Sequence, residues 1–385
     1  MLSMNIIPAE QSEFEFWYGD LEIPQSEAEL AEYLLNMPIP EWCQKIKTTS
    51  TPEKKWFLAS GLQKAVRRGD SRFAVRCASA LLHVDYEYLW RRLPVIAFED
   101  VGLGNPLACA LTLLLCKSKK WRQQNNERMM AFAVIDMLAS GMKDRTCTDL
   151  MQIAGYWKLG DNFETGEIPA DDLEGIVFET QIFWHLLGTK RDKNDCVPAS
   201  DGSMQLWEKA LVDSDVPFLI EYLALRGRIG LSHPFYHTIV PLWRHMKAHE
   251  ASLDSVDNPP DPFGDEVIEG FPASTFDVHN AHGKRALAYW TKAYDRLTEL
   301  KASVKAPDWI KLLGSALFRV ESGYVNRQIE YPLRLPIYDK SVFYSHVCKG
   351  LPEDRIVEMK LILQNGREKL NYARKRILGA VPSQQ

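Results

Sequence analysis

The side chains best suited to chemistry in this sequence are basic ones that recur at helical spacing within residues 60–95. The group comprises Lys64, Arg67, Arg68, Arg72, Arg76, Arg91 and Arg92. Arginine donates hydrogen bonds in a planar fork that matches the oxygens of a phosphate, and phosphate contacts position a protein on nucleic acid. We therefore take these residues as candidate nucleic-acid contacts. The alternative is a solvated helix face whose charges are balanced by ion pairs within each helix.

A second polar group lies at the start of a helix that we expect to begin near Gly283. It comprises His279, His282, Lys284 and Arg285, with Asp277 just ahead of them. The free N–H groups of a helix N-terminus attract anions, and nearby cations add to that attraction. This stretch is our candidate anion or ligand site, and an enzyme of unrecognised type would use Asp277, His279 and His282. The alternative is a capping turn that docks one domain on another.

A third candidate lies near the N-terminus. Gln11, Phe14 and Phe16 have the spacing of the short peptides that bind sliding clamps, in which a glutamine precedes apolar anchors. Such peptides insert aromatic anchors into an apolar pocket. The alternative is a strand or tail folded against the chain's own core.

Signatures of catalysis and of cofactor binding are missing from the sequence. It contains no G-x-x-x-x-G-K-[ST] phosphate loop and no G-x-S-x-G nucleophile elbow. Two pairs of histidines at a spacing of four, His233 with His237 and His245 with His249, lack the H-E-x-x-H pattern of a zinc protease. We therefore expect no enzymatic activity, no catalytic residue, no cofactor and no metal site.

Composition limits the classes of partner. The 385 residues carry a formal net charge of -5, and 46% of them are hydrophobic. An acidic chain does not coat nucleic acid or an anionic membrane, so any contact with DNA must be local. The longest apolar run, residues 106–116, has about half the length that spans a bilayer, and the seven cysteines include no C-x-x-C pair. These features predict a cytoplasmic protein that has no membrane partner.

Helical periodicity dominates the elements that must position the candidate residues. Proline follows a capping residue at 51–52, 105–106 and 306–307, a pattern that starts helices. After the first of these, apolar residues recur every three or four positions until Gly69 ends the helix, and Asp70 caps the next one. Strand signals are few. The predicted fold class is all-α, a multi-helix bundle with a second, smaller helical domain.

A chain of this length usually folds as two or three domains. The acidic, proline-rich stretch 251–275 reads as a linker between them. We therefore predict an N-terminal extension at 1–50, a helical domain at 51–250 and a C-terminal helical domain at 276–385.

The segment from Gly61 resembles part of a known protein family. It reads GLQKAVRRGDSRFAVRCASALLHVDYEYLWRRLPVIAFEDVGLGNPLA, and it resembles the helical region that follows the ATPase module in the RarA/MgsA family of AAA+ replication and recombination ATPases. The shared pattern is a helix ending in lysine and arginine, a Gly-Asp turn, an apolar helix, a double arginine and an E-D-[IV]-G-L turn. The resemblance extends over residues 55–117, under a fifth of the chain. It implies a fold like the helical collar of a clamp loader, which serves for oligomerisation.

Two departures from the family pattern qualify what the resemblance implies. Pro94 lies just behind Arg91 and Arg92 and should kink the third helix, and the phosphate loop of the ATPase is absent. The resemblance therefore predicts a non-enzymatic protein of DNA replication or recombination. We expect it to form homo-oligomers and to contact DNA or a clamp-loader-type protein through its local basic face. The alternatives are a structural or assembly protein without nucleic-acid contact, and the enzyme of unrecognised type described above.

Overall fold

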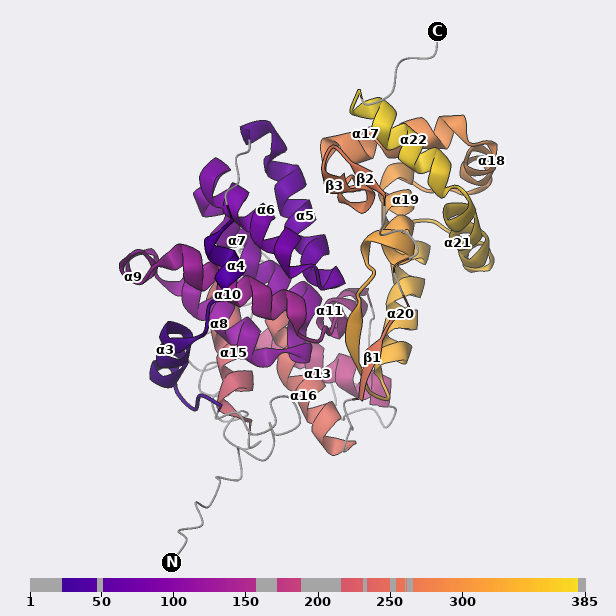
Figure 1. The fold of residues 1–385 in the computed structure, drawn as a ribbon. Coiled ribbons are helices and arrows are strands. Elements are labelled where there is room, and N and C mark those ends of the chain that lie inside the picture. The colour runs from indigo at the N-terminus through magenta and orange to yellow at the C-terminus, as the bar shows by residue number, and fades with distance from the viewer. Residues whose placement is uncertain are drawn as a thin grey trace, which may run out of the picture. The chain divides into compact units, whose positions relative to one another are not determined.

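The structure, a computed structural model, is largely helical, which confirms the helical character predicted from the sequence (Figure 1). It describes residues 23–46, 51–156, 172–187, 216–230, 234–249, 254–259, 261 and 266–379. Within these residues the named strands form two small sheets, β1 (Asp254–Asp257) with β4 (Arg327–Glu330) and β2 (Val267–Ile268) with β3 (Phe271–Pro272). None of the described helices combines the length and the apolar character needed to cross a bilayer.

The chain divides into two compact units, each assembled from separated segments. Unit 1 comprises residues 1–45, 90–256 and 328–337, and unit 2 comprises residues 46–89, 257–327 and 338–385. The predicted division into domains at 51–250 and 276–385 differs from this arrangement, because residues 46–89 belong with the C-terminal part of the chain. Aromatic packing explains the difference: the ring of Phe57 lies 5.0 Å from that of Phe276 and 6.0 Å from that of Phe271, measured between centroids.

Unit 1 is built around helix α8 (Pro106–Lys117), whose side chains are almost all buried. Its other elements are α3 (Glu27–Asn36), α4 (Glu41–Gln44), η3 (Gly102–Gly104), α9 (Lys119–Gln124), α10 (Glu127–Ser140), α11 (Thr146–Tyr156), α13 (Asp172–Leu187), α15 (Phe218–Gly230), η4 (Pro234–Thr238) and α16 (Ile239–Ala248). Asn105 caps α8, because its Oδ1 accepts a hydrogen bond from the backbone N–H of Ala108 at 3.0 Å. The helix start predicted at 105–106 is confirmed. Helices α10 and α15 pack against α8.

Helix α7 (Tyr86–Ile96) contains Pro94 and passes directly into a π-helical turn, η2 (Ala97–Val101). Pro94 has no backbone N–H to donate to the preceding helical turn. Gly102 follows with a φ of +49°, a backbone conformation that favours glycine. A Cβ atom at this position would lie 2.6 Å from the carbonyl oxygen of Asp144.

Unit 2 contains the basic segment and the C-terminal helices. Its elements are η1 (Pro52–Lys54), α5 (Lys55–Arg68), α6 (Ser71–Val84), η5 (Ala273–Thr275), α17 (Ala281–Ala293), α18 (Asp295–Ser303), α19 (Trp309–Leu317), η6 (Phe318–Ser322), η7 (Glu353–Arg355), α21 (Ile356–Asn365), α22 (Arg367–Ile377) and the greater part of α20 (Arg334–Val347). Apolar side chains of its C-terminal helices form one core, with Trp290 fully buried among them. The strands and turns at 267–275 show that part of the predicted linker is structured.

Helices α5 and α6 are joined as the sequence predicted. Gly69 ends α5 with a φ of +75°. Asp70 caps α6, because its Oδ1 accepts a hydrogen bond from the backbone N–H of Phe73 at 2.9 Å. Leu58 and Leu62 are buried at the expected helical spacing. These local features fix where the basic side chains of α5 begin and end.

Candidate nucleic-acid interface and a buried charge network

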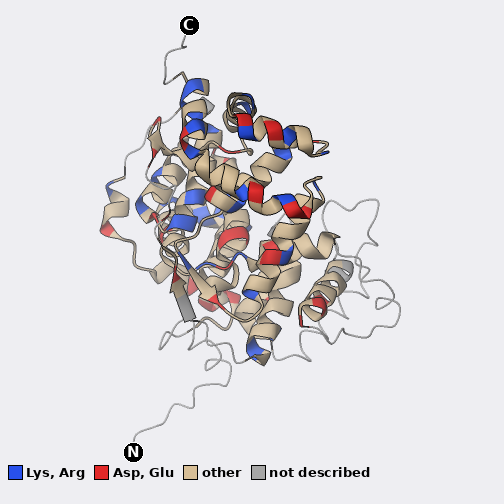
Figure 2. Ribbon diagram, turned by 90° about the vertical axis from the view of Figure 1, so that its right-hand side faces the viewer, with Lys and Arg blue, Asp and Glu red and all other residues tan. Residues whose placement is uncertain are grey.

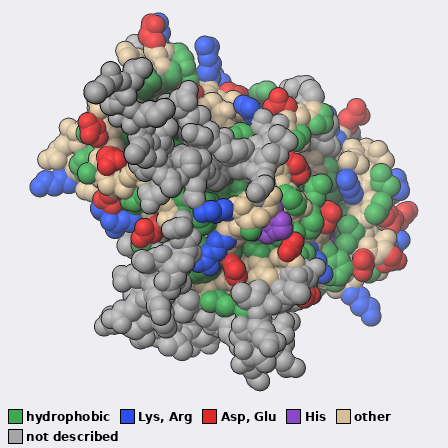
Figure 3. Space-filling model, turned by 90° about the horizontal axis from the view of Figure 1, so that it is seen from below, with side chains coloured by type: hydrophobic (Ala, Val, Ile, Leu, Met, Phe, Trp, Pro, Cys, Tyr) green, Lys and Arg blue, Asp and Glu red, His purple; other side chains and the backbone are tan. Residues whose placement is uncertain are grey.

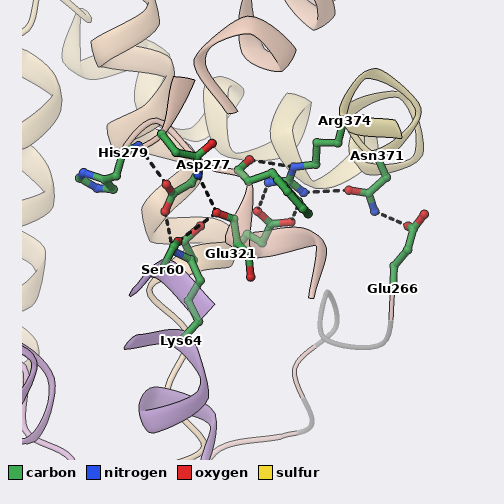
Figure 4. A network of polar contacts seen from close by, with 12 residues as sticks. Ser60, Lys64, Glu266, Asp277, His279, Glu321, Asn371 and Arg374 are labelled. Atoms are coloured by element: carbon green, nitrogen blue, oxygen red, sulfur yellow. Dashed lines mark hydrogen bonds and ion pairs between the residues drawn. The ribbon is translucent and has the colours of Figure 1, made fainter. Parts of the chain in front are cut away.

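Lys64 lies in the interior of unit 2. Its Nζ is 2.5 Å from Oδ2 of Asp277 and donates to Oγ of Ser60 at 2.8 Å (Figure 4). The Lys64 side chain is 3% exposed and that of Asp277 is 5% exposed. The second carboxylate oxygen of Asp277 accepts a hydrogen bond from the backbone N–H of His279 at 2.9 Å. Both oxygens of the buried carboxylate are therefore satisfied.

The surroundings of Asp277 favour its ionised form. Burial by itself would raise the pKa of this carboxyl, because it removes water from the charged state. The charges of Lys64 and His279 and the hydrogen bonds outweigh burial and hold the pKa of Asp277 below its ordinary value. The contact with Lys64 is therefore a buried ion pair.

The two arginines at the end of α5 bind backbone carbonyls of the π-helical turn η6. Arg67 donates from Nη1 to the carbonyl oxygen of Ser322 at 2.7 Å. Arg68 donates to the carbonyl oxygen of Glu321 at 3.1 Å and to Oδ2 of Asp261 at 2.7 Å. The last carbonyls of a helical turn lack donors from within that turn. Arg67 supplies a donor to the carbonyl of Ser322, and Arg68 adds a second donor to the carbonyl of Glu321, which also accepts from the backbone N–H of Tyr324 at 3.2 Å. These contacts hold η6 against α5.

These contacts correct the orientation that we expected for the basic end of α5. The spacing predicted that Lys64, Arg67 and Arg68 face solvent, whereas Arg67 is 2% exposed and the Arg68 side chain is 11% exposed. The helix is covered on two sides. One side packs against α6, and the other meets the segment that follows η5 and the end of η6. Polar partners from these distant segments bury the polar face.

The other four candidates for nucleic-acid contact are more accessible. Arg72 and Arg76 are exposed on α6, and Arg91 is exposed on α7. Arg92 is half-buried, with Nη2 4.0 Å from Oε2 of Glu99. The first two belong to unit 2, and the Arg91–Arg92 pair belongs to unit 1. Basic and acidic residues are interspersed along the described helices (Figure 2), and the face drawn in Figure 3 carries side chains of both charges.

A second buried ion pair adjoins the Lys64 contacts (Figure 4). Arg374 on α22 donates to both carboxylate oxygens of Glu321, at 2.7 and 2.6 Å, and the two side chains are 0% and 1% exposed. Arg374 also donates to the carbonyl oxygen of Phe276 at 3.1 Å and to Oδ1 of Asn371 at 2.8 Å. Asn371 in turn donates to Glu266. The network therefore ties α22 to η6 and to the turn beside η5.

Sequence reasoning missed the buried ion pair of Arg374 and Glu321. The sequence did contain a signal for the burial of Arg374, because Leu370 lies four residues before it and Ile377 three residues after it on the apolar side of α22. A charge within an apolar stripe requires a buried partner.

The predicted anion or ligand site is a capped helix start. Helix α17 begins at Ala281, and Asn280 accepts a hydrogen bond from the backbone N–H of Gly283 at 2.8 Å. The side-chain amide of Asn280 donates to the carbonyl oxygen of Thr275 at 2.8 Å. This arrangement favours the capping-turn alternative, since one of the free N–H groups of the helix is already satisfied.

The four predicted ligands of that site differ in exposure. His282 is half-buried, with its ring 5.0 Å from the ring of Phe57 between centroids, and burial and the charge of Arg285 lower the pKa of His282. His279, Lys284 and Arg285 are exposed. The neighbouring Asp277, which the enzyme alternative required, is paired with Lys64. The proposed clamp-binding residues Gln11, Phe14 and Phe16 lie outside the described residues.

The carboxylates of the E-D-V-G-L turn form ion pairs. Asp100 is fully buried with Oδ1 3.4 Å from Nε of Arg145, and Oε1 of Glu99 lies 3.9 Å from Nη2 of the same arginine. This agrees with a structural role for the turn. Across the described residues, no group of three or more His, Cys, Asp or Glu side chains is arranged to hold a metal ion.

Comparison with protein families, with curated proteins and with solved structures found no match to this chain.

Proposed function

We propose that this protein is a non-enzymatic scaffold that self-associates in replication or recombination complexes and contacts a clamp-loader-type protein. The resemblance of residues 55–117 to the helical region of the RarA/MgsA family supports this role, as does the largely helical fold. The observation that favours this role over DNA contact through the same basic residues is the internal use of Lys64, Arg67 and Arg68, whose partners lie in other segments of unit 2.

The basic end of α5 therefore stabilises the fold of unit 2, because it holds separated segments together. For these side chains to reach DNA phosphates, Asp277 and Asp261 would have to give up their partners. Removing one member of a buried ion pair leaves an uncompensated charge, at a cost of about 3–5 kcal/mol. Contact with DNA through these three residues is therefore disfavoured.

Local contact with DNA through other arginines is a second candidate function. Arg72 and Arg76 are exposed and stand four residues apart, on one side of α6. Arg91 is exposed on α7. Exposed guanidinium groups at this spacing suit contact with neighbouring phosphates, which fixes position without reading sequence.

Fluorescence anisotropy with labelled single-stranded and duplex DNA separates the two functions. Arg72→Ala/Arg76→Ala removes exposed charge, and Lys301→Ala/Lys360→Ala removes the same charge from exposed positions on α18 and α21 as a control. Contact through α6 predicts that only the arginine variant loses affinity, by about tenfold at ~50 mM salt, with a shallower salt dependence. A scaffold without DNA contact predicts no saturable binding of either DNA by the unmodified chain.

Self-association and partner binding test the scaffold role directly. Mass photometry over a range of concentrations should detect species larger than the 44.1 kDa monomer. A purified RarA/MgsA-type ATPase mixed with the chain should sediment as a joint complex. A chain that stays monomeric and binds no such ATPase would contradict the proposal.

A further inference from the structure

Helices α17 and α22 of unit 2 pack side by side and carry mostly positive charge (Figure 1). The chain as a whole has a formal net charge of -5. Glu368 is the one acidic residue in the sequences of these two helices. Their lysine and arginine residues are Lys284, Arg285, Lys292, Arg367, Lys369, Arg374, Lys375 and Arg376. Positive charge is therefore concentrated at this place in an otherwise acidic protein.

Two of these cations have partners inside the fold. Arg374 is paired with Glu321, as described above, and Nζ of Lys375 lies 2.7 Å from Oε1 of Glu266. A second set, in contrast, forms no ion pair with any residue that the structure describes, and it comprises Arg285, Lys292, Lys369 and Arg376. The charges of this second set are therefore not neutralised within the described part of the fold.

The four unneutralised cations belong to one face that extends over both helices. Arg285, Tyr289 and Lys292 recur at spacings of four and three, so they share one side of α17. Arg376 of α22 reaches this side: its Nη1 donates to the hydroxyl of Tyr289 at 3.0 Å, and its guanidinium carbon lies 4.9 Å from the ring centre. Lys369 lies seven residues before Arg376 and shares its side of α22.

The cations of this face remain accessible. Arg285, Lys292 and Lys369 are exposed, and Arg376 is half-buried. The hydrogen bond to Tyr289 uses one of the five N–H groups of a guanidinium. Tyr289 therefore positions Arg376 without neutralising its charge.

The spacing of the charges indicates what kind of anion fits them. Seven residues of a helix rise by about 10 Å, which separates Arg285 from Lys292 and Lys369 from Arg376 along their helices. Neighbouring packed helices lie about 8–10 Å apart. A face of this size suits a polymer that carries phosphates at intervals, because such a polymer presents one anion to each cation.

The same face lacks what a membrane surface requires. A helix that lies on a bilayer inserts large apolar side chains between the lipids. Among the described residues, the exposed large apolar side chains lie outside α17 and α22. Nucleic acid does not require such anchors, because arginine and lysine contacts to backbone phosphates suffice to hold it.

We propose that the α17–α22 face, formed by Arg285, Lys292, Lys369 and Arg376, binds the phosphate backbone of nucleic acid. The contact does not read base sequence, and DNA and RNA share the phosphate chemistry. The inference goes beyond the scaffold role, which does not depend on it, and it differs from DNA contact through α6. The three can therefore fail separately.

Fluorescence anisotropy of the full chain with labelled duplex DNA, single-stranded DNA and single-stranded RNA tests this face. We expect saturable binding with a Kd on the order of 1–100 μM near physiological salt, the range of contacts that do not read sequence. Four phosphate contacts predict that log Kd for the duplex rises with log salt concentration with a slope of about 3–4.

Substitutions on exposed side chains locate the contact. Arg285→Gln/Lys292→Gln should weaken binding by about tenfold or more at ~100 mM salt and lower the salt slope by about 2. Lys369→Gln should lower the slope by about 1. Lys301→Gln/Lys360→Gln is the matched control, because it removes the same charge from exposed positions on α18 and α21. An unchanged Tm in the double variants shows that folding is intact.

Four results would overturn the proposal. The first is no saturable binding of any of the three nucleic acids at ~50 mM salt up to about 100 μM protein. The second is an equal loss of affinity in Arg285→Gln/Lys292→Gln and in its control, which would indicate overall charge. The third is a loss in Arg72→Ala/Arg76→Ala with none in Arg285→Gln/Lys292→Gln, which would place the contact on α6. The fourth is sedimentation with vesicles that contain phosphatidylserine in a chain that binds no nucleic acid.

Discussion

The ammonium of Lys64 lies 2.5 Å from Oδ2 of Asp277, and both side chains are almost wholly buried. This contact joins helix α5 to a turn that lies 213 residues further along the chain. It joins two segments of unit 2 that are far apart in the sequence, so no local sequence pattern predicts it.

Lys64→Met should destabilise the protein by about 3–5 kcal/mol, because it leaves the Asp277 carboxylate buried without its counter-charge. Adding Asp277→Asn should recover part of this loss, since asparagine keeps the acceptor for the backbone N–H of His279. Urea unfolding of both variants and of the unmodified chain measures the effect.

Lys301→Met serves as the matched control for this substitution, because it removes an exposed lysine of α18 and should change stability by no more than about 0.5 kcal/mol. Equal stability of Lys64→Met and Lys301→Met would rule out a buried ion pair at Lys64.

Acid should weaken the fold through Asp277. Its pKa is lower in the folded protein than the ordinary aspartate value of about 3.9. The stabilisation is therefore complete above that ordinary value and is lost as the pH falls toward the lower folded-state pKa. The free energy of unfolding, measured between pH 6 and pH 3, should fall more steeply for the unmodified chain than for Lys64→Met/Asp277→Asn. Parallel curves of the free energy of unfolding against pH for the two proteins would show that Asp277 does not contribute to this pH dependence.

Arg374→Met should also destabilise unit 2 by about 3–5 kcal/mol, because Glu321 would lose two charged hydrogen bonds at a site that is 1% exposed. Glu321→Gln should cost less, since an amide oxygen can still accept from the arginine. Thermal unfolding shows which of the two variants is the less stable. The reverse order would indicate that the pairing of Arg374 and Glu321 is not what stabilises α22.

Local features of this fold were readable from the sequence, and the buried partners were not. Gly69 and Asp70 act within one or two turns of the chain, so their types alone mark the end of α5 and the start of α6. The basic residues of α5 looked solvent-exposed because their side of the helix carries no apolar stripe. Their partners follow after roughly two hundred residues, and no periodicity connects a helix face to such a distant carboxylate.

The start of α17 illustrates the same limit at the candidate anion site. Sequence patterns placed a helix start and nearby cations correctly within a few residues of Ala281. They did not distinguish a helix end open to a ligand from one already capped. That distinction depends on the side chain of Asn280, which accepts from Gly283 and donates to Thr275.

Gly283→Ala should destabilise the protein through the same turn. A Cβ atom at Gly283 would lie 1.8 Å from the carbonyl oxygen of Asp277, and backbone atoms cannot rotate away as a flexible side chain can. The turn must therefore shift, and with it the carboxylate that pairs with Lys64. We expect a loss of about 1–3 kcal/mol or more in the free energy of unfolding, measured with urea.

Gly155→Ala in α11 is the matched control, because its Cβ would have nothing nearer than 3.9 Å and alanine favours a helix by about 1 kcal/mol. A Gly283→Ala protein as stable as the Gly155→Ala control would mean that this close approach, and the position of Asp277 that depends on it, does not exist in solution.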